Sequence, residues 1–403
     1  MTSPPRTLQS LPTQLPFVGV ADVLEAPGAC VIDLRSPGEF AQDHVPGAVN
    51  VPLLDDVERA VVGTLYKQVS PDAAFERGRG LIAERIEGLV RRIAEICVER
   101  GLPEPSVSGA RERVLDWTSE GFEGFRDKLH PEPATELPRH AVVLHCWRGG
   151  MRSMSVIALM RALGITTAVG LEGGYKAYRR HVLDQLERWT APRTYVLRGL
   201  TGVGKSLVLR EIEALRPGWT LDLEACAGHR SSLLGKVGLE PVSQKAFESR
   251  IARRLREAHA EDGPREVTLI EGESRKVGDV IVPGSIWSAM CGASNLLLEA
   301  DVPRRTQVLR DDYLATADSK RELREQLAQV EPRMNPPAEL VRMFDEGRID
   351  ELVAILLEHY YDPLYRHSEK GRAISARFDA SDERATARAI VDFIEAESCP
   401  HES

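Results

Sequence analysis

The sequence lacks several features that mark whole classes of proteins. It has six cysteines in 403 residues, and none forms a CxxC pair, so neither a disulfide framework nor a zinc site is expected. No apolar run approaches the ~18 residues that a transmembrane helix needs, so no membrane partner is expected. The first sixteen residues lack the pattern of a signal peptide and are expected to form a short disordered lead-in. Together these absences favour a reducing, cytoplasmic setting.

The chain also lacks a net positive charge. Its formal charge is −9, which argues mildly against a nucleic acid partner. Residues 140–182 differ from this average, because they hold one acidic residue and six basic ones: Arg148, Arg152, Arg161, Lys176, Arg179 and Arg180. A local field of this kind can attract an anion whatever the net charge.

Strand-like and helix-like segments alternate along the chain. Short β-rich runs at 29–34, 48–51, 141–146 and 167–171 are separated by helical segments, and the alternation restarts after Ala191-Pro192. This order predicts α/β domains built on parallel sheets. We expect a first domain at 14–188 with a helical insertion at about 71–139, which includes one helix at roughly 109–128. A second domain is expected at 189–310, with a mostly helical region at 311–403 packed on it.

The stretch LHCWRGGMRSMS at 144–155 carries the first chemical signal. Cys146 ends a predicted strand, a helix follows from about Ser153, and Arg148 and Arg152 flank two glycines. Inward-turned amides, a helix N-terminus and two guanidinium groups all favour a thiolate. Three readings stay open here: a chalcogen-carrying cysteine, a cysteine phosphatase with its HC-x5-R loop, or a buried structural thiol.

A phosphate-binding pattern supplies the second signal. Residues 199–206 read GLTGVGKS and lie between a predicted strand and a predicted helix, as a P-loop requires. Gly199, Gly202 and Gly204 let the backbone close around a phosphate pair, Lys205 adds charge, and Ser206 can ligate Mg²⁺. Further candidates are two acids that could hold a metal or water and three arginines that could close over a phosphoryl group: Glu271, Glu273, Arg304, Arg305 and Arg310. Any diphosphate would suit these amides, so the pattern does not specify ATP.

Several segments resemble known families. VIDLRSPGEFAQDHVPGAVNVP (31–52) and VGLEGGYKAYRR (169–180) resemble the two flanks of a rhodanese active loop. With CWRGGMRS and the P-loop, the chain as a whole resembles the bacterial tRNA 2-selenouridine synthase family. The matching positions are Asp33, Arg35, Glu58, Arg59, Gly63, Thr64, Tyr66, Lys67, Glu224, His229, Arg230, Glu271, Glu273, Arg275 and the YDPLY of 361–365. Ser231 stands where the family usually has glycine, and residues 101–130 look longer than the family's helices there.

The resemblance implies a rhodanese-like domain followed by a P-loop domain and a two-step reaction on tRNA. Wobble 2-thiouridine would be S-alkylated with geranyl diphosphate, and selenium from selenophosphate would then displace geranyl thiol. No tightly bound cofactor is implied, although Mg²⁺ could assist. The implied partners are the anticodon region of tRNA and an enzyme that produces selenophosphate, and Arg253, Arg254 and Arg256 could add to the tRNA surface.

The sequence also leaves other interpretations open. Tyr175 and Tyr178 could stack on an anticodon base, or could pack in the core. The rival functions are a sulfurtransferase fused to a regulatory nucleotide-binding module, a small-molecule kinase or ATPase, and a cysteine phosphatase.

Overall fold

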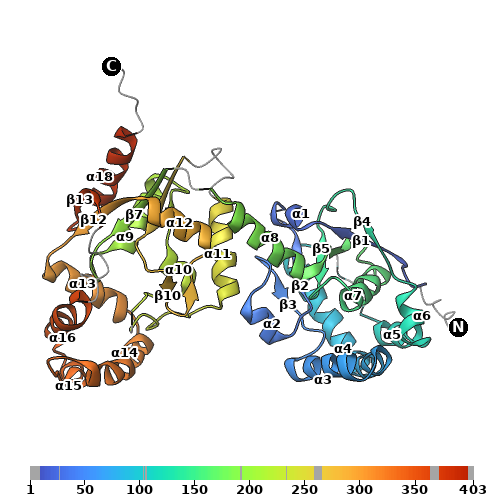
Figure 1. The fold of residues 1–403 in the computed structure, drawn as a ribbon. Coiled ribbons are helices and arrows are strands. Elements are labelled where there is room, and N and C mark those ends of the chain that lie inside the picture. The colour runs from blue at the N-terminus through green and yellow to red at the C-terminus, as the bar shows by residue number, and fades with distance from the viewer. Residues whose placement is uncertain are drawn as a thin grey trace, which may run out of the picture. The chain divides into compact units, whose positions relative to one another are not determined.

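The computed structural model describes residues 10–26, 28–102, 104, 107–190, 193–232, 234–257, 266–363 and 372–397. The chain divides into two compact units, Met1–Val182 and Leu183–Ser403, and helix α8 (Gly174–Arg188) runs across the division (Figure 1). Among the described residues, no helix is long and apolar enough to cross a membrane.

The first unit contains a six-stranded parallel sheet with the strand order β3-β2-β5-β6-β1-β4. Its strands are β1 (Gln14–Val18), β2 (Cys30–Asp33), β3 (Val49–Asn50), β4 (His130–Pro133), β5 (Val142–His145) and β6 (Ala168–Leu171). The central strands β2, β5 and β6 are buried along their whole length, as expected when helices cover both faces. The helices directly linked to these strands are α1 (Val20–Leu24), α2 (Pro37–Gln42) and α7 (Met151–Ala162).

Four further helices form an insertion between β3 and β4: α3 (Asp56–Gln68), α4 (Pro71–Glu99), α5 (Ala110–Trp117) and α6 (Gly121–Arg126). The long helix α4 buries a stripe that includes Ile86, Val90 and Ile93 at three- and four-residue spacing, and it lies within the predicted helical insertion. Helix α3 packs beside α4 below the sheet in Figure 1, yet none of its own residues is buried. Helix α3 therefore contacts α4 without burying any of its own side chains.

The second unit contains a five-stranded parallel sheet with the order β13-β12-β7-β9-β8. Its strands are β7 (Arg193–Arg198), β8 (Thr220–Leu221), β9 (Val267–Glu271), β12 (Ser294–Glu299) and β13 (Ile374–Asp379), with a β10–β11 hairpin at Lys276–Val277 and Val280–Ile281. Its helices are α9 (Lys205–Leu215), α10 (Leu223–Ala227), α11 (Gln244–Glu257), α12 (Gly284–Gly292), α13 (Val302–Tyr313), α14 (Ala317–Val330), α15 (Leu340–Asp345), α16 (Ile349–Leu356) and α18 (Glu383–Ala396).

The predicted parallel α/β architecture is confirmed, but several local predictions were wrong. The expected disordered lead-in is wrong for Gln14–Pro16, which belong to β1 and pair with β4. The region 311–403 is mostly helical as predicted, but it also contains a strand that was not predicted, β13 at Ile374–Asp379, which pairs with β12. The helix expected at 109–128 is interrupted at 118–120, between α5 and α6.

Strands β4 and β13 were not predicted, and the two share a physical cause. Every residue of β4 (HPEP) is exposed, and β13 alternates between half-buried and exposed residues, so neither carries a strong apolar signal. Both are edge strands of their sheets. Their position follows from backbone pairing with a distant partner strand, which no local pattern encodes. Ala191-Pro192, Leu364-Tyr365 of the YDPLY motif and Cys399 lie outside the described residues.

Candidate functional site

The loop after β5 is held in a tight turn by contacts between backbone atoms. Its Gly149 has φ +67°, and an added Cβ there would lie 2.9 Å from the Leu171 carbonyl oxygen. A Cβ on Gly174 would lie 2.5 Å from the Cys146 carbonyl oxygen, which itself accepts a hydrogen bond from the Tyr175 amide at 3.0 Å. These glycines are therefore needed where the loop meets the start of α8.

Cys146 lies at the bottom of this loop and is only 3% exposed. Its Sγ is 3.4 Å from Ser153 Oγ, at the start of α7. Burial alone would raise the pKa of the thiol, but the Arg152 charge and hydrogen bonds from Ser153 and two backbone amides outweigh it and lower the pKa below its usual value. The structure thus brings Cys146 and Arg152 together, and it adds Ser153, which the sequence reading had not singled out.

Asp33 and Arg35 form a buried support behind the loop. Both side chains are fully buried, and Arg35 Nη2 is 2.5 Å from Asp33 Oδ2. The Arg35 guanidinium lies 3.7 Å from the Tyr175 ring centre, and the Tyr175 hydroxyl donates to Asp43 Oδ2 at 2.8 Å. His145 is also fully buried, and burial lowers the pKa of its imidazole. These residues position the loop from within the core.

The prediction that Tyr175 and Tyr178 stack on an anticodon base is wrong. Each side chain is 1% exposed, and their ring centres lie 6.0 Å apart in the core. The alternative role, core packing, applies to both. The helix α8 places these rings on its buried face, which the short segment YKAY did not reveal.

A cavity of about 910 Å³ opens directly beside Cys146. Its walls come from α3 to α7 and the cysteine loop, and six of its apolar residues are Phe75, Ile82, Val114, Trp117, Phe122 and Met151. Arg148 and Arg152 line the same cavity. So do five of the six residues of the family motif on α3: Arg59, Gly63, Thr64, Tyr66 and Lys67. The sixth, Glu58, pairs with Arg85 at 2.7 Å, while Arg59 pairs with Glu39 at 3.0 Å.

The phosphate loop of the second unit joins β7 to α9. Gly199 (φ +153°), Gly202 (φ +78°) and Gly204 (φ +91°) all have positive φ, and a Cβ on Gly202 would lie 2.8 Å from the Arg305 carbonyl oxygen. Lys205, the first residue of α9, is 9% exposed, and its Nζ donates to the Gly199 carbonyl at 3.5 Å. The adjoining cavity is small, about 60 Å³. This geometry presents backbone amides and a helix N-terminus to an anion.

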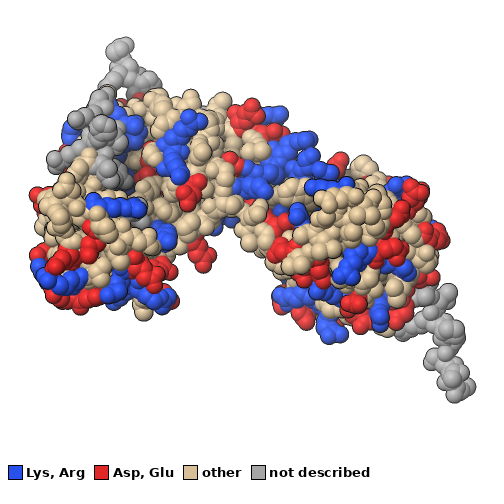
Figure 2. Space-filling model, turned by 60° about the horizontal axis from the view of Figure 1, so that its bottom comes forward, with Lys and Arg blue, Asp and Glu red and all other residues tan. Residues whose placement is uncertain are grey.

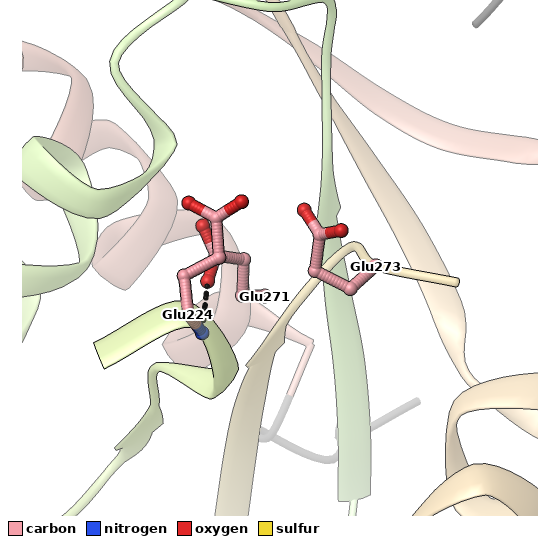
Figure 3. Close-up of side chains that lie close together, drawn as sticks. All are labelled: Glu224, Glu271 and Glu273. Atoms are coloured by element: carbon pink, nitrogen blue, oxygen red, sulfur yellow. Dashed lines mark hydrogen bonds between the residues drawn. The ribbon is translucent and has the colours of Figure 1, made fainter. Parts of the chain in front are cut away.

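Three carboxylates lie beside this loop. Glu224 of α10, Glu271 at the end of β9 and Glu273 just after it can place ligand oxygens within 4.8 Å of one another (Figure 3). Glu271 accepts from Ser206 Oγ at 3.2 Å and from the Glu224 amide at 3.1 Å. Burial, followed by repulsion between neighbouring carboxylates, raises the pKa of both Glu224 and Glu271 well above the usual range. Oxygen donors of this kind fit Mg²⁺, whose charge would relieve the repulsion.

The arginines near the loop have well-defined partners. Arg305 is buried, donates to the Thr201 carbonyl at 2.8 Å and forms a two-pronged pair with Asp362. Arg304 pairs with Glu383 at 2.6 Å, and Arg310 pairs with Asp350 at 2.7 Å. Arg305 therefore supports the phosphate loop from behind, and closure of these arginines over a phosphoryl group stays a prediction. Asp362 belongs to the YDPLY motif, whose sequence did not reveal this pairing.

The remaining candidates of this unit are Arg230, Arg275 and His229. Arg230 lines the small cavity and lies 4.8 Å from the Tyr313 ring centre, while Arg275 is exposed on the segment after β9. His229 packs tightly against Gly278, and burial lowers the pKa of its imidazole. Ser231 has φ +48°, a left-handed conformation, which explains why glycine suits this position.

Positive charge is unevenly distributed over the surface. Figure 2 shows one face of the molecule. Acidic and basic side chains are intermingled over much of it, and lysine and arginine side chains gather in one area. Within the basic segment 140–182, Arg148, Lys176 and Arg180 are exposed. Arg161 instead donates to the carbonyls of Thr166 and Ala168, so it serves the fold.

Comparisons with known proteins cover both units. Residues 192–397 match the family model of the tRNA 2-selenouridine synthase AAA domain, and residues 20–75 match that of the rhodanese-like domain. The chain is 30% identical over 400 residues to the tRNA 2-selenouridine synthase of Cupriavidus necator, covering 92% of this chain and 95% of that protein. The protein of the same name from Hydrogenovibrio crunogenus is 29% identical, and the match covers 87% of this chain and 93% of that protein. The one from Nitrosomonas europaea is 26% identical, and the match covers 94% of this chain and 99% of that protein.

The match extends over most of the chain, and the cysteine loop and the phosphate loop both have the local geometry that their motifs predict. The chain belongs to the tRNA 2-selenouridine synthase family.

Proposed function

We propose that this protein replaces the sulfur of wobble 2-thiouridine in tRNA with selenium from selenophosphate, through an S-geranylated intermediate made from geranyl diphosphate. The observation that carries the proposal is that one chain of this family combines a P-loop with a cysteine that lies beside Ser153 and Arg152, whose charge and hydrogen bonds lower the pKa of the thiol. A thiocarbonyl sulfur departs poorly, whereas the alkylated sulfur departs as a thiol. The two loops suit these two steps.

The phosphate loop serves the alkylation step. The amides of Gly202 and Gly204 and the Lys205 ammonium bind the diphosphate of geranyl diphosphate. Ser206 and the carboxylates of Glu224, Glu271 and Glu273 would hold Mg²⁺, which would supply positive charge to stabilise the departing diphosphate. In this step the sulfur–carbon bond forms as the carbon–oxygen bond to diphosphate breaks, so no oxidant is required.

The cysteine loop serves the selenation step. Selenium in selenophosphate is already at the selenide level found in the product, so its transfer needs no oxidant, whereas a perselenide on Cys146 would need one. We place the Cys146 thiolate as the nucleophile at phosphorus, where a sulfur–phosphorus bond forms and hydrogen selenide leaves. Water then releases phosphate from the cysteine, selenide attacks C2, and the carbon–sulfur bond breaks to free geranyl thiol with a proton. Ser153 and Arg152 adjoin the reacting thiolate.

The direct test is mass spectrometry of tRNA nucleosides. Incubation with geranyl diphosphate alone should yield S-geranyl-2-thiouridine, and later addition of selenophosphate should yield 2-selenouridine. Turnover of thiosulfate without any change in tRNA would instead indicate a sulfurtransferase, and nucleotide hydrolysis without either product would indicate a kinase or ATPase.

Binding of tRNA provides a second measurement. Exposed basic residues such as Arg148, Lys176 and Arg180 release counterions when they contact phosphates. The affinity for tRNA should therefore fall steeply as salt rises, and an affinity that does not respond to salt would contradict this binding surface.

A further inference from the structure

The cavity beside Cys146 is far larger than a selenophosphate ion requires. Its volume of about 910 Å³ lies within the ~300–1,000 Å³ of small-molecule sites. The side chains around it are mainly apolar and aromatic, contributed by Phe75, Trp117 and Phe122 among others. Such a lining disfavours an anion and favours a hydrocarbon group.

Charged groups and the reactive thiol also line this cavity. Cys146, Arg148 and Arg152 come from the loop after β5, and Lys67 comes from α3. One cavity therefore combines an apolar lining, a nucleophilic thiol and cations suited to phosphates. A ligand that fits must carry a hydrocarbon chain next to an anionic part, with its reacting atom close to sulfur.

The insertion helices build the apolar part of the cavity. Val114 and Trp117 come from α5, Phe122 and Phe125 from α6, and Gly63 and Tyr66 from the motif on α3. Helix α3 buries no residue and leaves Tyr66 58% exposed. A helix that lines a large cavity without filling it is expected where a ligand completes the packing.

We propose that this cavity takes the geranyl chain of the S-geranylated tRNA nucleoside while Cys146 acts at the selenation step. The assignment rests on the proposed function and deepens it, because it identifies the site that recognises the leaving group. Geranyl thiol departs into the apolar cavity as C2 exchanges its sulfur for selenium. The cations of the loop and of α3 hold the phosphates of the tRNA and of selenophosphate.

Two glycines make the proposal testable by filling the cavity. Gly78 on α4 and Gly63 on α3 both line it, and a Cβ built on either meets no atom within 4 Å. Neither has a positive φ, and leucine has a higher helix propensity than glycine. Gly78→Leu and Gly63→Leu should therefore fold and place a side chain in the cavity from two different helices. Gly88→Leu is the matched control, because Gly88 is exposed on α4, also has open space at Cβ and does not line the cavity.

The experiment measures kcat/KM for selenation of two synthetic tRNA substrates, one S-geranylated and one carrying the five-carbon-shorter S-dimethylallyl group. The wild-type protein should prefer the geranylated tRNA. Gly78→Leu and Gly63→Leu should each lower selenation of the geranylated tRNA about tenfold or more. They should lower selenation of the dimethylallyl tRNA much less, and Gly88→Leu should change neither. Thermal unfolding of each variant checks that it is folded.

Three results would overturn the proposal. Both cavity variants could selenate geranylated tRNA at the wild-type rate, or could lose activity equally on both substrates. They could also slow only the transfer of geranyl from geranyl diphosphate, which would assign the cavity to the donor. Failure of the proposed function is distinguishable, because the wild-type protein itself would then not selenate the pre-geranylated tRNA.

Discussion

The two loops adjoin cavities of very different size and lining. Beside Cys146 the cavity measures about 910 Å³ and has mainly apolar walls, whereas beside the phosphate loop it measures about 60 Å³ and is lined by Lys205, Glu271 and other polar residues. A diphosphate is bound by a few backbone amides at close range, so it needs little space. A hydrocarbon chain is recognised only by the area it buries, so it needs a wide apolar surface.

The same two regions differ in how they treat charge. Around Cys146, positive charge and hydrogen bonds outweigh burial and lower the pKa of the thiol. Around Glu271, burial and neighbouring carboxylates raise the pKa. The charge near Cys146 favours the thiolate form of that side chain, and the three carboxylates near the phosphate loop offer oxygen ligands to a cation. The difference supports the proposal that the geranylation step and the selenation step are carried out by different units of the chain.

The largest effect is expected for Cys146→Ala. Removal of the thiolate should abolish selenation while leaving geranyl transfer intact, so S-geranyl-tRNA should accumulate in nucleoside mass spectra. Cys291→Ala is the control, since Cys291 is exposed and does not line this cavity. Continued selenation by Cys146→Ala would contradict the assignment of selenation to the cysteine loop.

A similarly specific but smaller effect is expected for Lys205→Ala. Loss of the ammonium should lower geranyl transfer by about a hundredfold or more, by analogy with loss of one charge-stabilising donor. Selenation of pre-geranylated tRNA should stay near the wild-type rate. Lys320→Ala, at an exposed position of α14, should change neither step. Simultaneous loss of both steps in Lys205→Ala would mean that the two loops do not divide the reaction.

The smallest effect is expected for Arg152→Ala, which tests whether the charge of Arg152 lowers the pKa of Cys146. Because Arg152 lowers the pKa of Cys146, its removal should raise that pKa and reduce the thiolate fraction at neutral pH. The rate of alkylation by iodoacetamide, followed against pH, should then rise at a higher pH than in the wild-type protein. Arg180→Ala, at an exposed position of α8, is the control. Coincident pH profiles for all three proteins would show that Arg152 does not tune the thiol.

Features that depend on neighbouring residues were largely predicted correctly from the sequence, whereas features that depend on residues distant in the sequence were not. The cysteine loop and the phosphate loop were predictable, because glycine spacing and flanking strands determine their backbone. The stacking role of Tyr175 was wrong because burial depends on which face of α8 packs in the core, where Tyr175 contacts Arg35 and Asp43. The pairing of Arg305 with Asp362 could not be predicted, since 57 positions separate them.

The sequence by itself determined the class of fold, the order of the two motifs and the residues proposed as nucleophile and as phosphate ligands. These features follow from local periodicity and from side-chain chemistry at short spacing. Only the tertiary structure decided that the family motif on α3, the helices at 110–126 and Cys146 line one cavity. A cavity is defined by the space that several distant helices leave unfilled, and no local segment encodes that space.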